Sequence, residues 1–156
     1  MTPDVENQID WPGFFRSRQA LGADFIRILG YFREDGTKSV AAIEAAMRAR
    51  DAAALVIPAH TLKGESLQFG AETLAALAEE IETVARHCVE MQRPPDELIR
   101  RVVLLRPLFE ETLALFDREV SPLVERRIPG GFGRKPVANP QGFGREIGRA
   151  SCRERV

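Results

Sequence analysis

The chain lacks long hydrophobic runs, a disulfide framework and an obvious targeting segment. No apolar run approaches the roughly 20 residues that a membrane-spanning helix needs, so we expect no membrane span. The amino-terminal MTPDVENQID is polar and acidic, unlike a secretory signal. The only two cysteines, Cys88 and Cys152, are too few for a disulfide framework. Together these absences favour a protein of the reducing cytoplasm.

Nucleotide and metal sites are also missing from the sequence. Neither a P-loop nor the kinase signatures occur, so we expect no ATP binding and no autophosphorylation. His87 and Cys88 are neighbours that point in different directions on a helix, and no second Cys/His pair occurs within residues 1–145. Because zinc needs about four ligands, we predict no metal and no resident cofactor.

Charge is unevenly distributed along the chain. Residues 1–126 hold 15 Lys and Arg against 21 Asp and Glu, whereas residues 127–156 hold 7 against 2. An acidic body argues against nucleic-acid binding. The basic end, rich in Gly, Pro and Arg and carrying GFGR twice, is interpreted as a disordered extension.

What the sequence does contain is helical periodicity. Apolar residues recur at helical spacing, and no segment alternates as a strand does. The predicted helices are 11–18, 21–34, 37–49, 51–70, 71–91 and 96–125. Asp35-Gly36 is predicted to separate the second helix from the third, and Thr37 and Asp51 are predicted N-caps. A kink or a helix restart is expected at each of three prolines: Pro58, Pro107 and Pro122. Amphipathic helices with short links predict an all-α protein folded as an antiparallel helical bundle.

The segment 59–64 places one histidine and one lysine on one helical face. At about 100° per residue, Leu62 falls roughly opposite His60, and Leu55 and Phe69 share that apolar side. Lys63 lies about 60° to one side of His60 and Gly64 about 40° to the other. A buried core histidine is the ordinary alternative, but this pattern predicts that His60 faces outward.

The string AHTLKGESLQFG, residues 59–70, resembles the motif of the histidine-containing phosphotransfer (HPt) domain of bacterial phosphorelays. The resemblance extends over about residues 20–125 and implies a four-helix bundle with a short extra amino-terminal helix. Glu65 and Leu67 depart from the motif, since the family usually has small residues at these positions. Neither departure touches the His-Lys-Gly centre, but both affect the surface that a partner would meet.

The resemblance implies that His60 carries a phosphoryl group, with Nε2 as the reacting atom. A neutral imidazole can attack the aspartyl phosphate of a receiver domain and later pass the group on. Lys63 would stabilise the phosphate charge, and Gly64 would leave room for the partner. Magnesium would belong to the receiver. The implied partners are the receiver domains of a hybrid histidine kinase and of a response regulator. The protein itself is expected to be a monomer.

A rim of side chains near His60 is predicted to dock the partner. Val56, Ile57 and Leu67 fall within about 60° of His60 on the wheel and would form an exposed apolar surface. Gln68 joins this docking set and is a weaker candidate for hydrogen bonding to the phosphoryl group.

Four segments are predicted along the chain: an amino-terminal segment with a short helix at 1–19, the HPt bundle at 20–126, a flexible tail at 127–145, and residues 146–156. The last string, EIGRASCRERV, resembles a sequencing adapter read through in frame, which would make it an artefact. Two other functions stay open: a module that binds a receiver without carrying phosphate, and a helical fragment of a larger signalling kinase.

Overall fold

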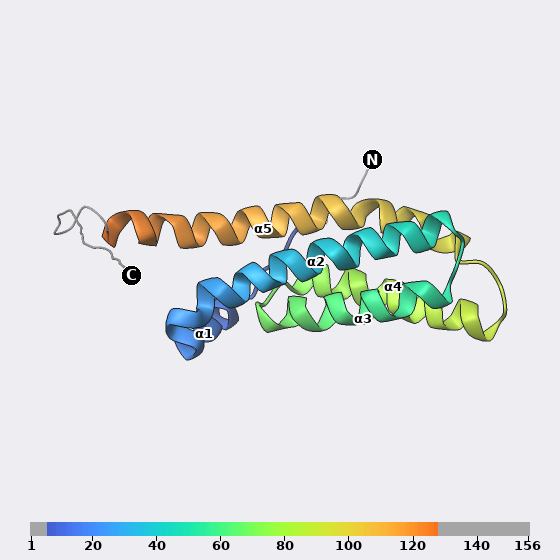
Figure 1. The fold of residues 1–156 in the computed structure, drawn as a ribbon, viewed down its shortest axis with the longest axis horizontal. Helices are drawn as coiled ribbons and strands as arrows, with labels where there is room; N and C mark the ends of the chain where they lie inside the picture. The colour runs from blue at the N-terminus through green and yellow to red at the C-terminus, as the bar shows by residue number, and fades with distance from the viewer. Residues whose placement is uncertain (1–5, 128–156) are drawn as a thin grey trace, which may run out of the picture. The chain divides into compact units, whose positions relative to one another are not determined.

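The computed structural model describes residues 6–127, and for residues 121–127 it describes the backbone alone. Five helices follow one another (Figure 1): α1 Trp11–Leu21, α2 Phe25–Arg48, α3 Ala53–Gln68, α4 Glu72–Glu90 and α5 Ile99–Arg127, with single 3₁₀ turns at Gly22–Asp24 and Asp96–Leu98. Apart from an isolated bridge between Ile9 and Ala71, residues 6–127 contain no β-structure. The predicted all-α class is therefore confirmed.

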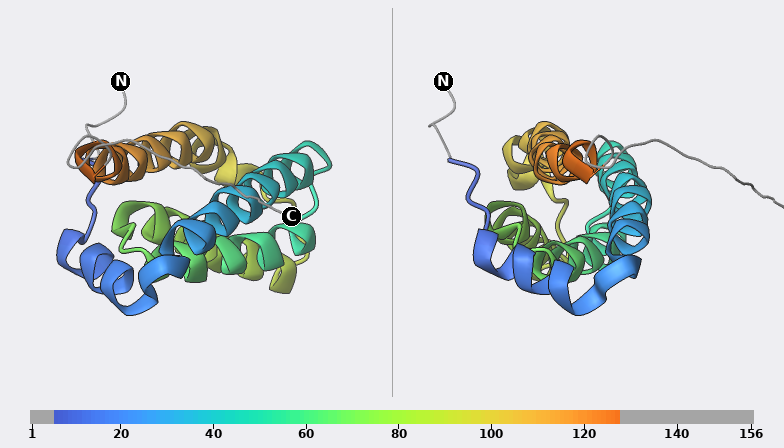
Figure 2. Two further views of the ribbon diagram at one scale, coloured as in Figure 1. Left: turned by 60° about the vertical axis from the view of Figure 1, so that its left-hand side comes forward. Right: turned by 90° about the vertical axis from the view of Figure 1, so that its left-hand side faces the viewer.

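The chain divides into two compact units, residues 1–113 and 114–156. In the first unit α2, α3, α4 and the part of α5 that ends at Leu113 form an antiparallel four-helix bundle (Figures 1 and 2). In the second unit the described part, residues 114–127, is α-helical. The predicted bundle is confirmed, and the site described below lies entirely in the first unit.

Helix α1 is held against the end of the bundle where α3 gives way to α4. The backbone N–H of Asp10 donates to the carbonyl of Gly70 over 2.7 Å, and the Ser17 hydroxyl donates to the carbonyl of Gln68 over 2.9 Å. Gly70 has φ +77°, and a side chain there would collide with the backbone of Asp10. Glycine is therefore required at this turn.

The core of the first unit is rich in aromatic rings. Phe32 on α2 contacts Phe69 at the end of α3, with ring centroids 5.3 Å apart, and Phe109 on α5, with centroids 5.8 Å apart. Phe25 contacts Phe69 edge to face at 5.8 Å. These contacts anchor α3 between its neighbours, and so they fix which side of α3 faces outward.

The predicted helix break at Asp35-Gly36 is wrong, because α2 runs unbroken from Phe25 to Arg48. Gly36 is buried, and a side chain at this position would collide with the ring of Phe109. Close packing thus outweighs the roughly 1 kcal/mol that glycine costs in a helix. Thr37 is not an N-cap either, since its hydroxyl donates to the Arg33 carbonyl within the helix.

The helices also continue through their prolines. Pro58 lies inside α3, and Pro107 and Pro122 lie inside α5, so the expected restarts do not occur. Proline removes one backbone hydrogen bond, and these helices tolerate that loss without ending. The predicted cap at Asp51 is confirmed: its Oδ1 accepts from the Ala54 N–H over 3.2 Å at the start of α3.

No helix among the described residues is long and apolar enough to cross a membrane. The four predicted segment boundaries stay predictions. The tail at 127–145, apart from Arg127, and the adapter-like residues 146–156 lie outside the described residues.

Candidate functional site

Helix α3 presents His60 on the side opposite its buried stripe. The side chains of Leu55, Ala59 and Leu62 are fully buried, whereas the side chain of His60 is 59% exposed. This arrangement follows from the spacing of apolar residues at three and four positions, which turns one face of α3 to the core. The predicted outward orientation of His60 is confirmed.

A glutamate from the neighbouring helix holds the imidazole. Glu82, on α4, places its Oε2 atom 3.0 Å from Nδ1 of His60. The Glu82 side chain is only 8% exposed, so this carboxylate lies at the base of the site between α3 and α4. Glu82 is not among the site residues predicted from the sequence.

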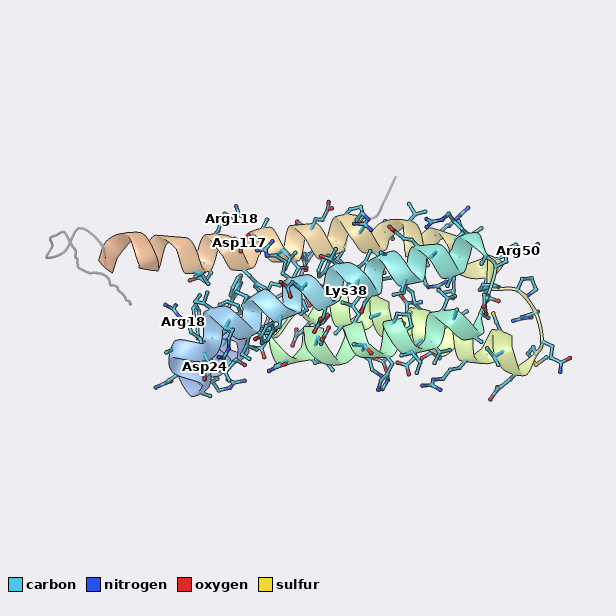
Figure 3. The ribbon with its side chains drawn as sticks, in the orientation of Figure 1. Arg18, Asp24, Lys38, Arg50, Asp117 and Arg118 are labelled. Atoms are coloured by element: carbon cyan, nitrogen blue, oxygen red, sulfur yellow. The ribbon has the colours of Figure 1, made fainter. Side chains whose placement is uncertain are left out.

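Two cations share the same carboxylate. The Lys63 ammonium lies 3.1 Å from Glu82 Oε1, and Arg86 donates to Oε2 over 2.8 Å and 3.1 Å. Lys63 is mostly buried, while Arg86, one turn along α4 from Glu82, is 57% exposed. The site therefore carries two cations around one carboxylate, with an exposed imidazole beside them (the surrounding side chains are drawn in Figure 3).

The contacts also decide the protonation state of Glu82. Burial alone would raise the pKa of Glu82, but hydrogen bonds from Arg86, Lys63 and His60 outweigh it and lower that pKa to about 2. Glu82 is thus ionised at neutral pH and can only accept hydrogen bonds. A neutral His60 must then carry its proton on Nδ1, and its Nε2 keeps a free lone pair.

Gly64 leaves open space beside His60. Among the residues that the structure describes, no atom lies within 4 Å of a Cβ atom built at this position. Packing within this part of the chain therefore does not require glycine at residue 64, unlike the buried Gly36. The open position is available to a group that approaches from outside.

The predicted docking residues lie on the same helix with different exposure. Ile57 is 70% and Leu67 is 58% exposed, Gln68 is exposed, and Val56 is half-buried. Gln68 follows His60 by eight residues, which places it about 12 Å along the helix axis. That separation suits contact with a partner better than contact with a phosphoryl group on His60.

The side chains gathered around Glu82 differ in kind from those of a metal site. Within the described range 6–127, no group of three or more His, Cys, Asp and Glu side chains is arranged to hold a metal ion. The cluster around Glu82 combines one carboxylate with cations, which suits an anionic ligand and not a metal ion.

Comparison with known proteins identifies the family. The model of the Hpt domain matches residues 27–116, which is more than half of the chain. The chain belongs to the Hpt domain family. This membership supports a role in histidine phosphotransfer within phosphorelays.

A solved structure agrees with this assignment of the Hpt domain. The chain is similar to histidine-containing phosphotransfer protein B (HptB) from Pseudomonas aeruginosa PAO1, with 29% sequence identity and a TM-score of 0.51. The match covers 68% of this chain and 94% of that one. No curated protein sequence matches the chain significantly.

The sequence of this Hpt domain contains one signal that points to Glu82. Glu82 falls in the helical pattern of α4 at a buried position, three residues after Glu79 and four before Arg86. A carboxylate on the apolar side of an amphipathic helix is unusual unless it is paired. The pattern could have marked Glu82 as paired, although it could not name His60 and Lys63 as the partners.

Proposed function

We propose that this protein is a phosphorelay intermediate that accepts a phosphoryl group on Nε2 of His60 from a receiver-domain aspartate and passes it reversibly to a response regulator. The observation that carries the proposal is the contact between Nδ1 of His60 and the ionised Glu82. This contact leaves Nε2 as the free nucleophile on a largely exposed imidazole.

Transfer of the phosphoryl group to His60 requires no additional proton and no metal ion bound to this chain. The Nε2 lone pair attacks the phosphorus atom of the aspartyl phosphate, the phosphorus–oxygen bond breaks, and the aspartate leaves as a carboxylate. The imidazole gains positive charge while Nδ1 keeps its hydrogen, and Glu82 stabilises that charge across 3.0 Å. Reversal of the same step returns the group to an aspartate.

Lys63 and Arg86 would stabilise the transferred group. Its charge lies on the equatorial oxygens, so nearby cations lower the barrier. Both cations already meet at Glu82, which holds them next to His60 before a partner arrives. Magnesium is expected in the receiver active site, on the partner.

The face around His60 suits a receiver domain. Gly64 leaves the imidazole accessible, and the exposed Ile57 and Leu67 offer apolar contact area on the same helix. We propose that one receiver belongs to a hybrid histidine kinase and the other to a response regulator. The side chains of the site come from α3 and α4 of one chain, which supports a monomer, and we propose that this monomer acts in the cytoplasm.

A phosphotransfer assay with a radiolabelled receiver tests the proposal. Wild-type protein should gain acid-labile label, and His60→Gln should gain none. His87→Gln is the matched control, because His87 is the other histidine of the chain and is also exposed. Label on the His60→Gln protein would refute the assignment, and receiver binding without any label on wild type would favour the non-phosphorylated binding module.

A further inference from the structure

The outward face of helix α5 carries apolar side chains that the phosphotransfer site does not use. Val103 is 67% exposed, Ile99 is 53% exposed and Leu104 is 36% exposed. Pro107, about one turn after Val103, is exposed as well. At about 100° per residue these four side chains lie on one side of the helix. Exposed apolar residues that gather on one face mark an interaction surface, whereas single scattered ones do not.

Two ion pairs show which way this face points. Arg106 donates to Glu44 of α2 over 2.7 Å and 3.0 Å, and Arg101 lies 3.4 Å from Glu80 of α4. Helix α5 therefore packs between α2 and α4, and its remaining side points away from α3. Figures 1 and 2 show α5 and α3 on opposite sides of the bundle. A partner on the outward face of α5 thus leaves His60 accessible to a receiver.

The two ends of this face carry opposite charges. Arg100 lies three residues before Val103, and Glu110 lies three residues after Pro107. Both charged side chains are exposed, and neither forms an ion pair within residues 6–127; Glu110 interacts with Arg106 only at longer range. Spacings of three and four residues place these side chains in one row, as along the seam of a coiled coil. The row and its flanking residues form the outer strip of α5: Ile99, Arg100, Val103, Leu104, Pro107 and Glu110.

We propose that the outer strip of α5 binds an amphipathic helix of another protein. Apolar side chains of the partner helix cover Val103 and Pro107. A carboxylate of the partner pairs with Arg100, and a partner cation pairs with Glu110, about 15 Å further along the helix. Apolar residues at helical spacing supply the contact area in this mode of recognition, and the charges set the register. The interaction is separate from phosphoryl transfer and does not rest on it.

The charges of the strip disfavour three other occupants. Residues 127–156 of this chain hold seven basic and two acidic residues, so Arg100 would repel them. Glu110 would likewise repel an anionic membrane surface. In a second copy that pairs Arg100 with Glu110, the two α5 helices run antiparallel and like flanks meet. Ile99 would then face the flank that carries the charged Arg106, whereas a helix of different sequence can place an apolar residue there.

A designed peptide tests the proposal with the full chain. The probe has about 20 residues, enough to be helical in solution, with leucines along one row and a glutamate and a lysine ten residues apart at its ends. In NMR of ¹⁵N-labelled protein the peptide should shift the signals of Ile99, Val103 and Leu104 and leave those of α3 in place. Val103→Glu should weaken binding about tenfold or more, because it places a carboxylate in an apolar contact. Ile26→Glu, at a similarly exposed residue of α2, is the matched control and should keep the wild-type affinity.

Charge reversal distinguishes specific docking from general apolar attraction. A second peptide, with lysine in place of the glutamate, should bind the wild-type protein about tenfold more weakly. Arg100→Glu should reverse this preference, since it sets two acids of the strip against two lysines. His60→Gln should bind the first peptide as wild type does, so that failure of phosphotransfer and failure of this proposal are distinguishable.

Peptide shifts confined to α3 would overturn the proposal, and so would an order of peptide affinities that Arg100→Glu leaves unchanged. Occupation of the strip by something else would overturn it as well. The corresponding observations are a dimer in sedimentation or binding to phosphatidylserine vesicles, if Val103→Glu abolishes either, and NMR cross-peaks between residues 128–156 and the Val103 methyl groups in the free protein.

Discussion

Nδ1 of His60 lies 3.0 Å from Oε2 of Glu82, and this contact joins the reactive helix α3 to its neighbour α4. A carboxylate at this distance accepts a hydrogen bond from the ring and so selects the imidazole tautomer with hydrogen on Nδ1. The nucleophilicity of Nε2 therefore depends on a residue that sequence position alone does not connect with His60.

Glu82→Gln should remove the preference of His60 for this tautomer while keeping the shape of the side chain at residue 82. A glutamine can donate or accept towards Nδ1, so ¹⁵N NMR should show mixed tautomers of His60 where wild type shows hydrogen on Nδ1. Transfer from a phosphorylated receiver should slow by about tenfold to a hundredfold, because a hydrogen bond to a charged group is worth about 1.5–3 kcal/mol. A wild-type spectrum with hydrogen on Nε2 of His60 would contradict this, and His87 in the same spectrum serves as the internal reference.

Lys63→Ala should slow phosphoryl transfer and shorten the lifetime of the phosphohistidine. Removing the ammonium takes away a cation that lies 3.1 Å from Glu82 and within one helical turn of His60. We expect a loss of about tenfold in transfer rate, which corresponds to about 1.4 kcal/mol. Quenched-flow transfer and the decay of isolated phosphoprotein measure the two effects. Lys38→Ala, a change at an exposed lysine of α2, is the control, and equal behaviour of the two variants would contradict a role for Lys63.

Gly64→Ala should make the protein more stable but slow phosphoryl transfer from a receiver domain. Its Cβ enters open space, so the helix should gain about 1 kcal/mol in unfolding free energy. Transfer from a receiver should slow, and slow further in Gly64→Leu, whereas phosphorylation by the small donor phosphoramidate should stay near the wild-type rate. Gly30→Ala is the control, since a Cβ there also meets no atom of residues 6–127 within 4 Å. If Gly64→Leu transfers from the receiver as fast as Gly30→Ala, steric access is not the reason for Gly64.

Gly36→Ala should destabilise the bundle, in contrast to Gly64→Ala. The added Cβ would collide with the ring of Phe109 in the core. Overpacking of this kind costs about 1–3 kcal/mol, and urea unfolding would show it as a lower midpoint. Phe109→Leu in the same chain should recover part of the loss. A Gly36→Ala protein as stable as wild type would show that the ring can move aside freely.

The sequence predicted the features that depend on local periodicity. The spacing of Leu55, Leu62 and Phe69 is sufficient to predict that His60 faces outward. The sequence also predicts the side-chain cap at Asp51. The break at Asp35-Gly36 failed because local propensity favoured a turn, while the contact with Phe109, more than seventy residues away, favours a continuous helix.

The environment of His60 could not be predicted for a similar reason. Glu82 meets His60 across a helix pair, and the register of α3 against α4 is set by packing and not by either helix alone. Likewise, Glu65 is recognisable in the sequence as a departure from small residues, but its half-buried position, with an Oε1 atom that lacks a hydrogen-bond partner among the described residues, depends on how the helices pack.

The most direct test of the central claim is the position of the phosphoryl group after transfer from a phosphorylated receiver. Two-dimensional NMR of ¹⁵N-labelled protein distinguishes phosphorus on Nε2 from phosphorus on Nδ1. The contact with Glu82 predicts Nε2-phosphohistidine at residue 60, with hydrogen retained on Nδ1. Phosphorus on Nδ1 of His60, or on His87, would contradict the account.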